Sequence, residues 1–294
     1  MTMSSVEPTT LTHEQLRAYR EHGYLQLDSF VGAECLDELR AASQVFIERS
    51  RELTGSNRTL DVEPGHTAEA PRLRRLVSPP DHHDTFLRFT MEGPPAQLAM
   101  ALLGGPIRFH HAKLNYKWSG GGEEVRWHQD IQFWPHTDFT PLTIGVYLDD
   151  VDDEMGPMGV LPGSHLGPLH DMYDADGNWA GAMNDADVDT LDLDAMVWLR
   201  GPAGSVTVHN CCMVHGSQPN HSIRARPLLL QTYSAADSYP IAGIGANGAA
   251  GRHSGTVIGG RASQLVAVDG RTMHGAPDWS RKGPPTIFGS QQAT

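Results

Sequence analysis

Two histidines and one aspartate have the residue types and the spacing that could hold a metal ion. His128 and Asp130 are separated by one residue, and His215 follows far downstream. Two imidazoles and one carboxylate on one face of a metal leave its other positions open, which is the ligand set of non-haem Fe(II) oxygenases. If His128 and Asp130 lie on a strand, their side chains at i and i+2 face one pocket, while Gln129 faces away.

The chain around these residues predicts a β-rich core. From about residue 106, short apolar segments alternate with Gly and Pro, and many short strands with turn signals indicate a β-sandwich or a barrel. The segment 142–148 shows the clearest alternation of two faces, and Thr143 lies on its less apolar face. The predicted strands are 125–132, 142–148, 160–165, 205–209, 213–216 and 227–233.

The residues before this region predict helices. Thr12 and Gln15 form a capping-box pattern, which indicates a helix over 13–22 that ends at Gly23. A short strand is expected over 24–27. A second helix follows it, because apolar residues recur there at near-helical spacing.

The length fits one large domain or two small ones, and one domain over residues 11–294 is the expectation, after a disordered tail over 1–10. Its helical part is expected to run to about residue 105, its β core over about 106–240, and an irregular C-terminal segment after that. Within the core, 171–201 is a long acidic stretch with little periodicity. Long loops in compact domains are often lids, so this insertion is predicted to be lid-like.

Charge and cysteine content exclude some classes of protein. The formal net charge of −13 makes a nucleic acid an unlikely partner. No 18-residue apolar run predicts a transmembrane helix, and residues 1–10 lack the pattern of a signal peptide. Three cysteines cannot form a fully paired disulfide framework, so a reduced, cytoplasmic location is expected.

Four motifs in order resemble the phytanoyl-CoA dioxygenase family. They are Trp127-His128-Gln129-Asp130, Leu161-Pro162-Gly163-Ser164-His165, Val214-His215-Gly216-Ser217 and Arg226. The resemblance runs from about residue 11 to 239. It implies a double-stranded β-helix, a jelly-roll or cupin-like core that is mainly β with flanking helices. It also implies Fe(II) as cofactor, with 2-oxoglutarate and O2 as cosubstrates.

The resemblance also implies roles for individual residues. The iron ligands fall on His128, Asp130 and His215. The arginine that pairs with the far carboxylate of 2-oxoglutarate falls on Arg226, eleven residues after His215, and Arg224 is a nearby competitor. A fork of fixed donors suits a carboxylate. The remaining predicted site residues are Lys113, Asn115 and Thr143 for the cosubstrate, and Trp134, by similarity to ectoine hydroxylases, for the substrate.

The implied reaction is hydroxylation of an unactivated C–H bond of a small molecule, with release of succinate and CO2. A carboxylate at Asp130 favours hydroxylation, desaturation or ring closure over halogenation, because related halogenases have Gly or Ala there. Two alternatives stay open: a cupin-like metal enzyme that does not use 2-oxoglutarate, and a non-catalytic barrel that serves as a binding module. The expected oligomeric state is a monomer or a homodimer, without nucleic-acid or membrane partners.

Overall fold

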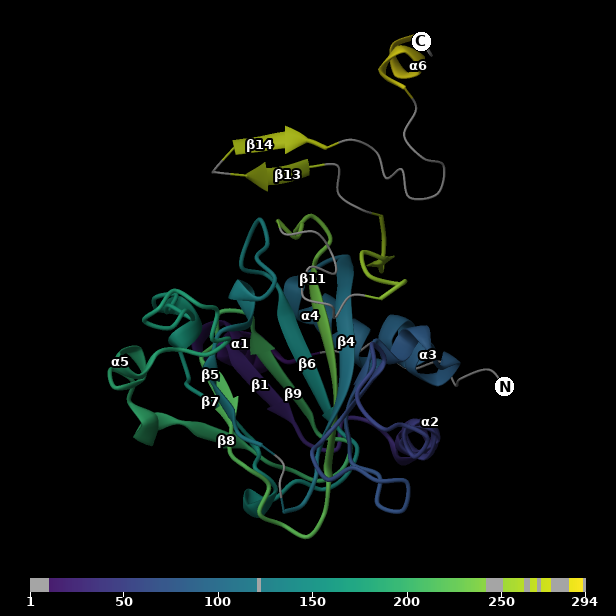
Figure 1. Cartoon of the computed structure of the whole chain (residues 1–294). Coiled ribbons are helices and arrows are strands. Elements are labelled where there is room, and N and C mark those ends of the chain that lie inside the picture. The colour runs from purple at the N-terminus through teal and green to yellow at the C-terminus, as the bar shows by residue number, and fades with distance from the viewer. Residues whose placement is uncertain are drawn as a thin grey trace.

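Two antiparallel β-sheets face each other in the computed structural model (Figure 1). It describes residues 11–120, 123–241, 251–261, 265–268, 271–275 and 286–292. The predicted tail over residues 1–10 therefore lies outside the described residues. None of the helices in the described ranges is long and apolar enough to span a membrane.

The larger sheet carries most of the buried core. Its strands, in spatial order, are β1 (Tyr24–Leu27), β9 (Val206–Asn210), β6 (Leu142–Tyr147), β11 (Arg226–Ala235), β4 (Ile107–Lys117), β3 (Leu73–Val77) and β2 (Leu60–Val62), with β12 (Val257–Ile258) also paired to β4. The smaller sheet consists of β5 (Val125–His128), β10 (His215–Ser217), β7 (Met158–Val160) and β8 (Val197–Leu199). A separate hairpin joins β13 (Leu265–Val268) to β14 (Arg271–His274).

Helices cover the outer side of the larger sheet (Figure 1). They are α1 (His13–His22), α2 (Ala33–Ser50), α3 (Asp84–Glu92) and α4 (Pro94–Leu103), and two short helices, α5 (Asp185–Val188) and α6 (Ile287–Gln292), lie later in the chain. The main apolar cluster joins α2, α3 and α4 to β4, β6, β9 and β11. The prediction of a mainly β fold with flanking helices is confirmed.

Strand β6 shows how this packing serves the site. Leu142, Ile144 and Val146 face the apolar cluster under the helices, as the alternation predicts. Thr143 faces the opposite side and lines the cavity between the two sheets. Every residue of β6 is buried, because helices cover one face and the smaller sheet covers the other.

One predicted segment differs from the structure. The strand predicted over 125–132 ends at His128, and Asp130 begins a 3-10 helix, η2 (Asp130–Gln132). Gln129 between them is still extended, with φ −122° and ψ 126°, so the expected i and i+2 geometry survives the end of the strand. The acidic insertion over 171–201, which shows little periodicity in the sequence, contains α5 and, at its end, β8 paired with β7.

The predicted start and end of the first helix are confirmed. Thr12 and Gln15 form the reciprocal capping box, and Gly23 ends α1 in the left-handed conformation with φ 77°. A Cβ at Gly23 would lie 2.3 Å from His165 Nδ1 and 2.5 Å from Met213 Cε, so the turn at residues 163–166 packs directly on this glycine. Gly104 ends α4 with a similar φ of 74°, but a Cβ added there would have no other atom within 4 Å.

These two glycines allow backbone strain and steric overlap to be separated. Gly104→Ala should lower the free energy of unfolding by about 1–2 kcal/mol, from left-handed strain alone. Gly23→Ala should lose roughly 2–5 kcal/mol, because overpacking against His165 and Met213 adds to the same strain. Urea unfolding of both variants measures the difference, and equal losses would show that the contact with the 163–166 turn is unimportant.

Candidate metal centre and active site

The structure brings His128, Asp130 and His215 together between the two sheets. One ligand atom from each residue lies within 4.8 Å of the others. His128 Nε2 is 3.7 Å and His215 Nε2 is 3.9 Å from the same oxygen, Asp130 Oδ1. His128 and His215 are directly opposite each other on β5 and β10, which explains why their ring centroids are 4.1 Å apart.

Backbone carbonyls fix the orientation of both histidine ligands. His128 Nδ1 lies 2.8 Å from the carbonyl of Arg126, and His215 Nδ1 lies 2.9 Å from the carbonyl of Met213. Since a carbonyl only accepts, each Nδ1 carries the proton, and each Nε2 keeps its lone pair for a metal. Such hydrogen bonds at the outer nitrogen are typical of metal-bound histidines.

Asp130 is held so that one of its oxygens is free. Its Oδ2 accepts from the Thr143 hydroxyl at 3.2 Å and lies 3.4 Å from His209 Nε2, whereas Oδ1 faces the two histidine ligands. Thr143 in turn is 3.0 Å from the hydroxyl of Thr232. The arrangement presents Oδ1 to a metal and keeps Oδ2 occupied, and the donor set of two nitrogens and one oxygen suits Fe(II).

The charge states of these groups favour metal binding. Burial alone would raise the pKa of Asp130, but the hydrogen bond from His209 and the nearby charge of Lys113 hold it well below its ordinary value. Burial lowers the pKa of His128 and of His215, and mutual repulsion between the imidazoles adds to the shift of His215. The site therefore offers one carboxylate and two neutral imidazoles, the protonation states that ligands require.

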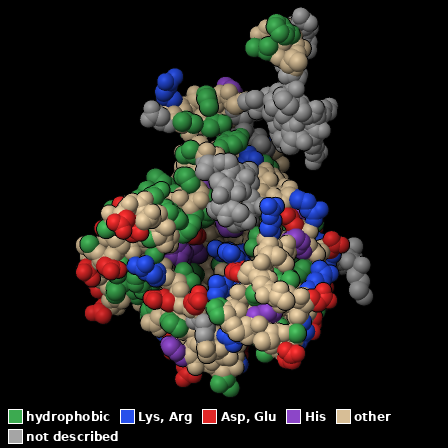
Figure 2. Space-filling model, viewed as in Figure 1, with side chains coloured by type: hydrophobic (Ala, Val, Ile, Leu, Met, Phe, Trp, Pro, Cys, Tyr) green, Lys and Arg blue, Asp and Glu red, His purple; other side chains and the backbone are tan. Residues whose placement is uncertain are grey.

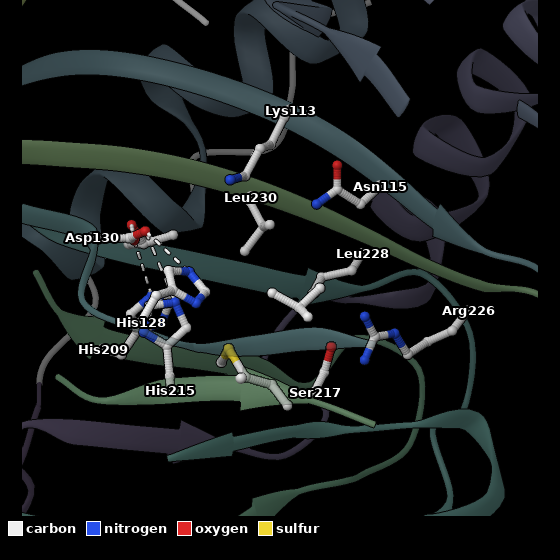
Figure 3. A pocket seen from close by; sticks show the side chains of 14 residues that line it. Lys113, Asn115, His128, Asp130, His209, His215, Ser217, Arg226, Leu228 and Leu230 are labelled. Carbon is white, nitrogen blue, oxygen red and sulfur yellow. Dashed lines mark hydrogen bonds and ion pairs between the residues drawn. The ribbon is translucent and has the colours of Figure 1, made fainter. Parts of the chain in front are cut away.

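Arg226 lies in the same cavity, at the end away from the three ligands (Figure 3). Only 5% of its surface is exposed; one guanidinium nitrogen donates to the carbonyl of Gly156, and its buried Nε has no partner. No carboxylate of the described residues lies within ion-pair distance of it. A buried cation without a counter-charge is costly, so this end of the cavity is suited to an anionic group.

The competing arginine lies elsewhere. Arg224 is half-exposed and forms an ion pair with Asp152 at 3.1 Å, outside the cavity. Lys113 and Asn115 line the cavity from β4, where Figure 3 shows Lys113 above Leu230 and Asn115 above Leu228. Figure 2, in the view of Figure 1, shows a hollow in which basic and histidine side chains gather, with acidic side chains around it.

Several residues of the site were not predicted. His209 faces Thr143 across paired strands β9 and β6, and sequence spacing cannot reveal this pairing. Ser217 and Lys117 lie near Arg226, with Lys117 Nζ 2.7 Å from the Ser217 hydroxyl. Burial and the charge of Arg226 lower the pKa of Lys117 to about 7.

Trp134 lies apart from the cavity that joins the ligands to Arg226. It is buried against His110 and His111, with ring centroids 5.5 and 6.0 Å away. The aromatic residue in contact with a predicted ligand is its neighbour Phe133, whose ring lies edge-on to His128 at 5.8 Å. Phe133 also contacts Trp179 of the insertion at 5.2 Å.

The fold and the site together define a metal-dependent oxygenase with a double-stranded β-helix. The family model described as phytanoyl-CoA dioxygenase matches residues 19–228, which include all three ligands and Arg226. The chain belongs to this family. The expected enzyme class and the dependence on Fe(II) and 2-oxoglutarate are thereby confirmed.

Comparisons with individual proteins agree. The chain is 34% identical over 234 residues to a probable alpha-ketoglutarate-dependent hypophosphite dioxygenase of Stutzerimonas stutzeri, covering 79% of this chain and 82% of the relative. It is 25% identical over 252 residues to the ectoine dioxygenase of S. stutzeri strain A1501, covering 80% of each. The structure of EctD from Sphingopyxis alaskensis with bound Fe has a similar fold, with a TM-score of 0.64 and 23% identity. The match covers 79% of this chain and 80% of that chain.

The position of His209 leads to a test of metal binding. His209→Phe keeps a ring in place but removes the contact with Asp130 Oδ2, so the carboxylate is free to turn. Fe(II) affinity should fall by roughly 10–100-fold, as is usual when the outer partner of a ligand is lost. His209→Gln, which can still donate, should lose less.

Anaerobic calorimetry with Fe(II) measures these affinities. His221→Phe, a change at an exposed histidine outside the site, is the matched control. Unchanged Fe(II) affinity in His209→Phe would show that Asp130 does not need His209 to present Oδ1.

Proposed function

We propose that this protein hydroxylates an unactivated C–H bond of a small molecule by using Fe(II), 2-oxoglutarate and O2. In the overall reaction, R–H, O2 and 2-oxoglutarate give R–OH, succinate and CO2, with one oxygen atom in the alcohol and the other in succinate. The observation that carries the proposal is one cavity with a metal-ligand set at one end and, at the other, a buried Arg226 that has no carboxylate partner among the described residues.

The residues of the chain divide the work. Bound iron supplies the activation of O2. His128, Asp130 and His215 would hold it, and Arg226 would pair with the far carboxylate of 2-oxoglutarate. Lys113, Asn115 and Thr143 line the space between and would orient the cosubstrate, while Leu228 and Leu230 exclude water from it. The intact carboxylate at Asp130 favours hydroxylation, or a related desaturation or ring closure, over halogenation.

The two alternatives receive less support. A cupin-like enzyme without 2-oxoglutarate has no need for a buried arginine facing the ligands, and a binding module has no need for three oriented ligands. The direct test is succinate release in the presence of Fe(II), 2-oxoglutarate and ascorbate. Asp130→Ala should abolish it, and full activity of that variant would exclude the proposed iron site.

The identity of the substrate is the open part of the proposal. The relatives are named for hypophosphite, ectoine and, in an L-proline trans-4-hydroxylase of Streptomyces griseoviridis that is 33% identical over 162 residues, L-proline. These three compounds are the first to assay. We further propose a monomer or homodimer in the cytoplasm, without nucleic-acid or membrane partners, in keeping with three free cysteines and a net charge of −13.

The role of Arg226 can be tested against Arg224. Arg226→Ala should raise the KM for 2-oxoglutarate on the order of 30-fold or more, since losing a buried charge-assisted contact costs roughly 2–5 kcal/mol. Arg224→Ala should leave this KM nearly unchanged, because its partner is Asp152 at the surface. A larger effect on this KM in Arg224→Ala than in Arg226→Ala would show that the assignment of the cosubstrate contact to Arg226 is wrong.

We also propose that the insertion over 171–201 acts as a lid. Its Trp179 packs on Phe133, which contacts His128, and the backbone N–H of Met183 donates to the carbonyl of Trp127. The insertion is thus attached beside the ligands through a partly exposed aromatic contact, which can close over a bound substrate and exclude water.

Coupling of the two half-reactions tests the lid. Trp179→Ala should raise the ratio of succinate to hydroxylated product, because water then enters the site. Leu193→Ala, an exposed residue of the same insertion, should leave the ratio unchanged. Hydrogen exchange over 171–200 should also slow when substrate binds the anaerobic iron and 2-oxoglutarate complex; equal exchange in both states, with normal coupling in Trp179→Ala, would remove the lid hypothesis.

A further inference from the structure

A second cluster of imidazoles lies beside the metal centre. His110 and His111 come from β4, and His136 follows η2 in the loop that carries Trp134. In the pairing of β4 with β11, His111 is opposite Thr232 and Phe109 is opposite Tyr233, so His110 has no residue opposite it. This register shift is a β-bulge. Bulges re-aim side chains and are frequent next to active sites.

Paired residues connect this cluster to the metal ligands. His111 is opposite Thr232 on β11, and Thr232 is opposite Thr143 on β6. Thr143 donates to Asp130. Two strand spacings, about 10 Å, therefore separate His111 from the residue that touches the ligand. Arg226 and the proposed cosubstrate space lie at the other end of β11, so the cluster is on the side left for the organic substrate.

The ring of His110 contacts those of His111 and His136, and all three rings contact Trp134. His110 Nδ1 and His111 Nδ1 are 2.6 Å apart, and the rings of His110 and His136 are 5.1 Å apart. His136 Nδ1 is 2.6 Å from the carbonyl of Trp134. All three histidines are more than nine-tenths buried, with 5%, 3% and 6% of their surface exposed.

Their Nε2 atoms are available to a ligand. None of the three has a hydrogen-bond partner within the described ranges. Because the Nδ1 atoms are engaged, Nε2 is the ring nitrogen that a polar group would contact.

The tautomers of the cluster determine what it can bind. Burial lowers the pKa of His110 to about 4 and also lowers the pKa of His111 and of His136. Repulsion between the rings and from Lys113 and Arg108 adds to these shifts, while Asp130 and Asp138 oppose them. The rings are therefore neutral near pH 7.

Neutral rings fix the count of donors and acceptors. Only one proton lies between the two Nδ1 atoms of His110 and His111, so one of these rings has an Nε2–H and the other an Nε2 lone pair. His136 uses its Nδ1–H on a carbonyl and keeps a lone pair at Nε2. The cluster offers two acceptors and one donor.

We propose that His110, His111 and His136 form the substrate-recognition site and bind a neutral, hydrogen-bond-donating group, a hydroxyl or a primary amide. A carboxylate or sulfonate offers only acceptors, which would face two lone pairs. An ammonium group offers only donors, so it leaves the one Nε2–H of the cluster without an acceptor. Sites built to bond a substrate OH or NH discriminate strongly against analogues that lack it. The inference rests on the proposed function, because it takes the iron as the reacting centre.

Four probes of similar size test the proposal on the whole chain. Propane-1,2-diol and propionamide donate hydrogen bonds, whereas propanoate and methanesulfonate only accept them near neutral pH. Each is titrated into 15N-histidine-labelled protein that contains Zn(II) and 2-oxoglutarate, and the imidazole 15N resonances are followed. The diol, the amide or both should shift the cluster resonances in a saturable way; which of them binds more tightly identifies the donor group.

Two variants test the residues themselves. His110→Phe and His136→Phe should each weaken binding of the neutral probe by about tenfold, the loss of one hydrogen bond. His136→Gln keeps an acceptor and should retain most of the affinity, and His221→Phe is the exposed control. Tighter binding of propanoate or methanesulfonate, or unchanged affinity in both Phe variants, would overturn the proposal.

Failure of this inference can be told from failure of the proposed function. Substrate-free succinate release by the wild-type protein depends on iron and 2-oxoglutarate, so it reports on the proposed function alone. Absence of succinate in the wild type would count against the function, while normal succinate release with the wrong probe selectivity would count against the recognition site alone.

Discussion

The site depends on a buried carboxylate that points one oxygen toward two histidines while hydrogen-bond partners hold its other oxygen. Burying an ionised group costs several kcal/mol unless partners replace its water. At Asp130 these partners are Thr143 and His209 on Oδ2, while Oδ1 is left facing His128 and His215. The groups come from both sheets, so the metal centre exists only when the sheets are correctly paired and face each other.

Strand register therefore matters more here than in an ordinary core. His128 and His215 are opposite each other on β5 and β10, and His209 is opposite Thr143 on β9 and β6. A slip by one residue would turn a side chain to the other face of its sheet. The helices on the outer side and the apolar face of β6 hold the larger sheet in the register that the ligands require.

The sequence was sufficient for local features and for the ligand set. A capping box, a left-handed glycine and an i, i+2 pair depend on neighbours in the chain, and α1 and the common orientation of His128 and Asp130 were predicted from them. The surface position of Arg224 and the partners of Asp130 were not, because they depend on contacts between distant strands. Nothing in the sequence distinguishes His209 from the other histidines, because its position beside Asp130 depends on the pairing of β9 with β6.

The cavity between the sheets combines a metal-ligand set with a buried arginine that has no carboxylate partner among the described residues. That combination is the central claim, and anomalous diffraction at the iron edge from crystals of the anaerobic Fe(II) and 2-oxoglutarate complex tests it most directly. We expect one iron bound by His128 Nε2, Asp130 Oδ1 and His215 Nε2, with the far carboxylate of 2-oxoglutarate on Arg226. Iron bound at His110, His111 and His136 instead, or 2-oxoglutarate bound without contact to Arg226, would contradict the account.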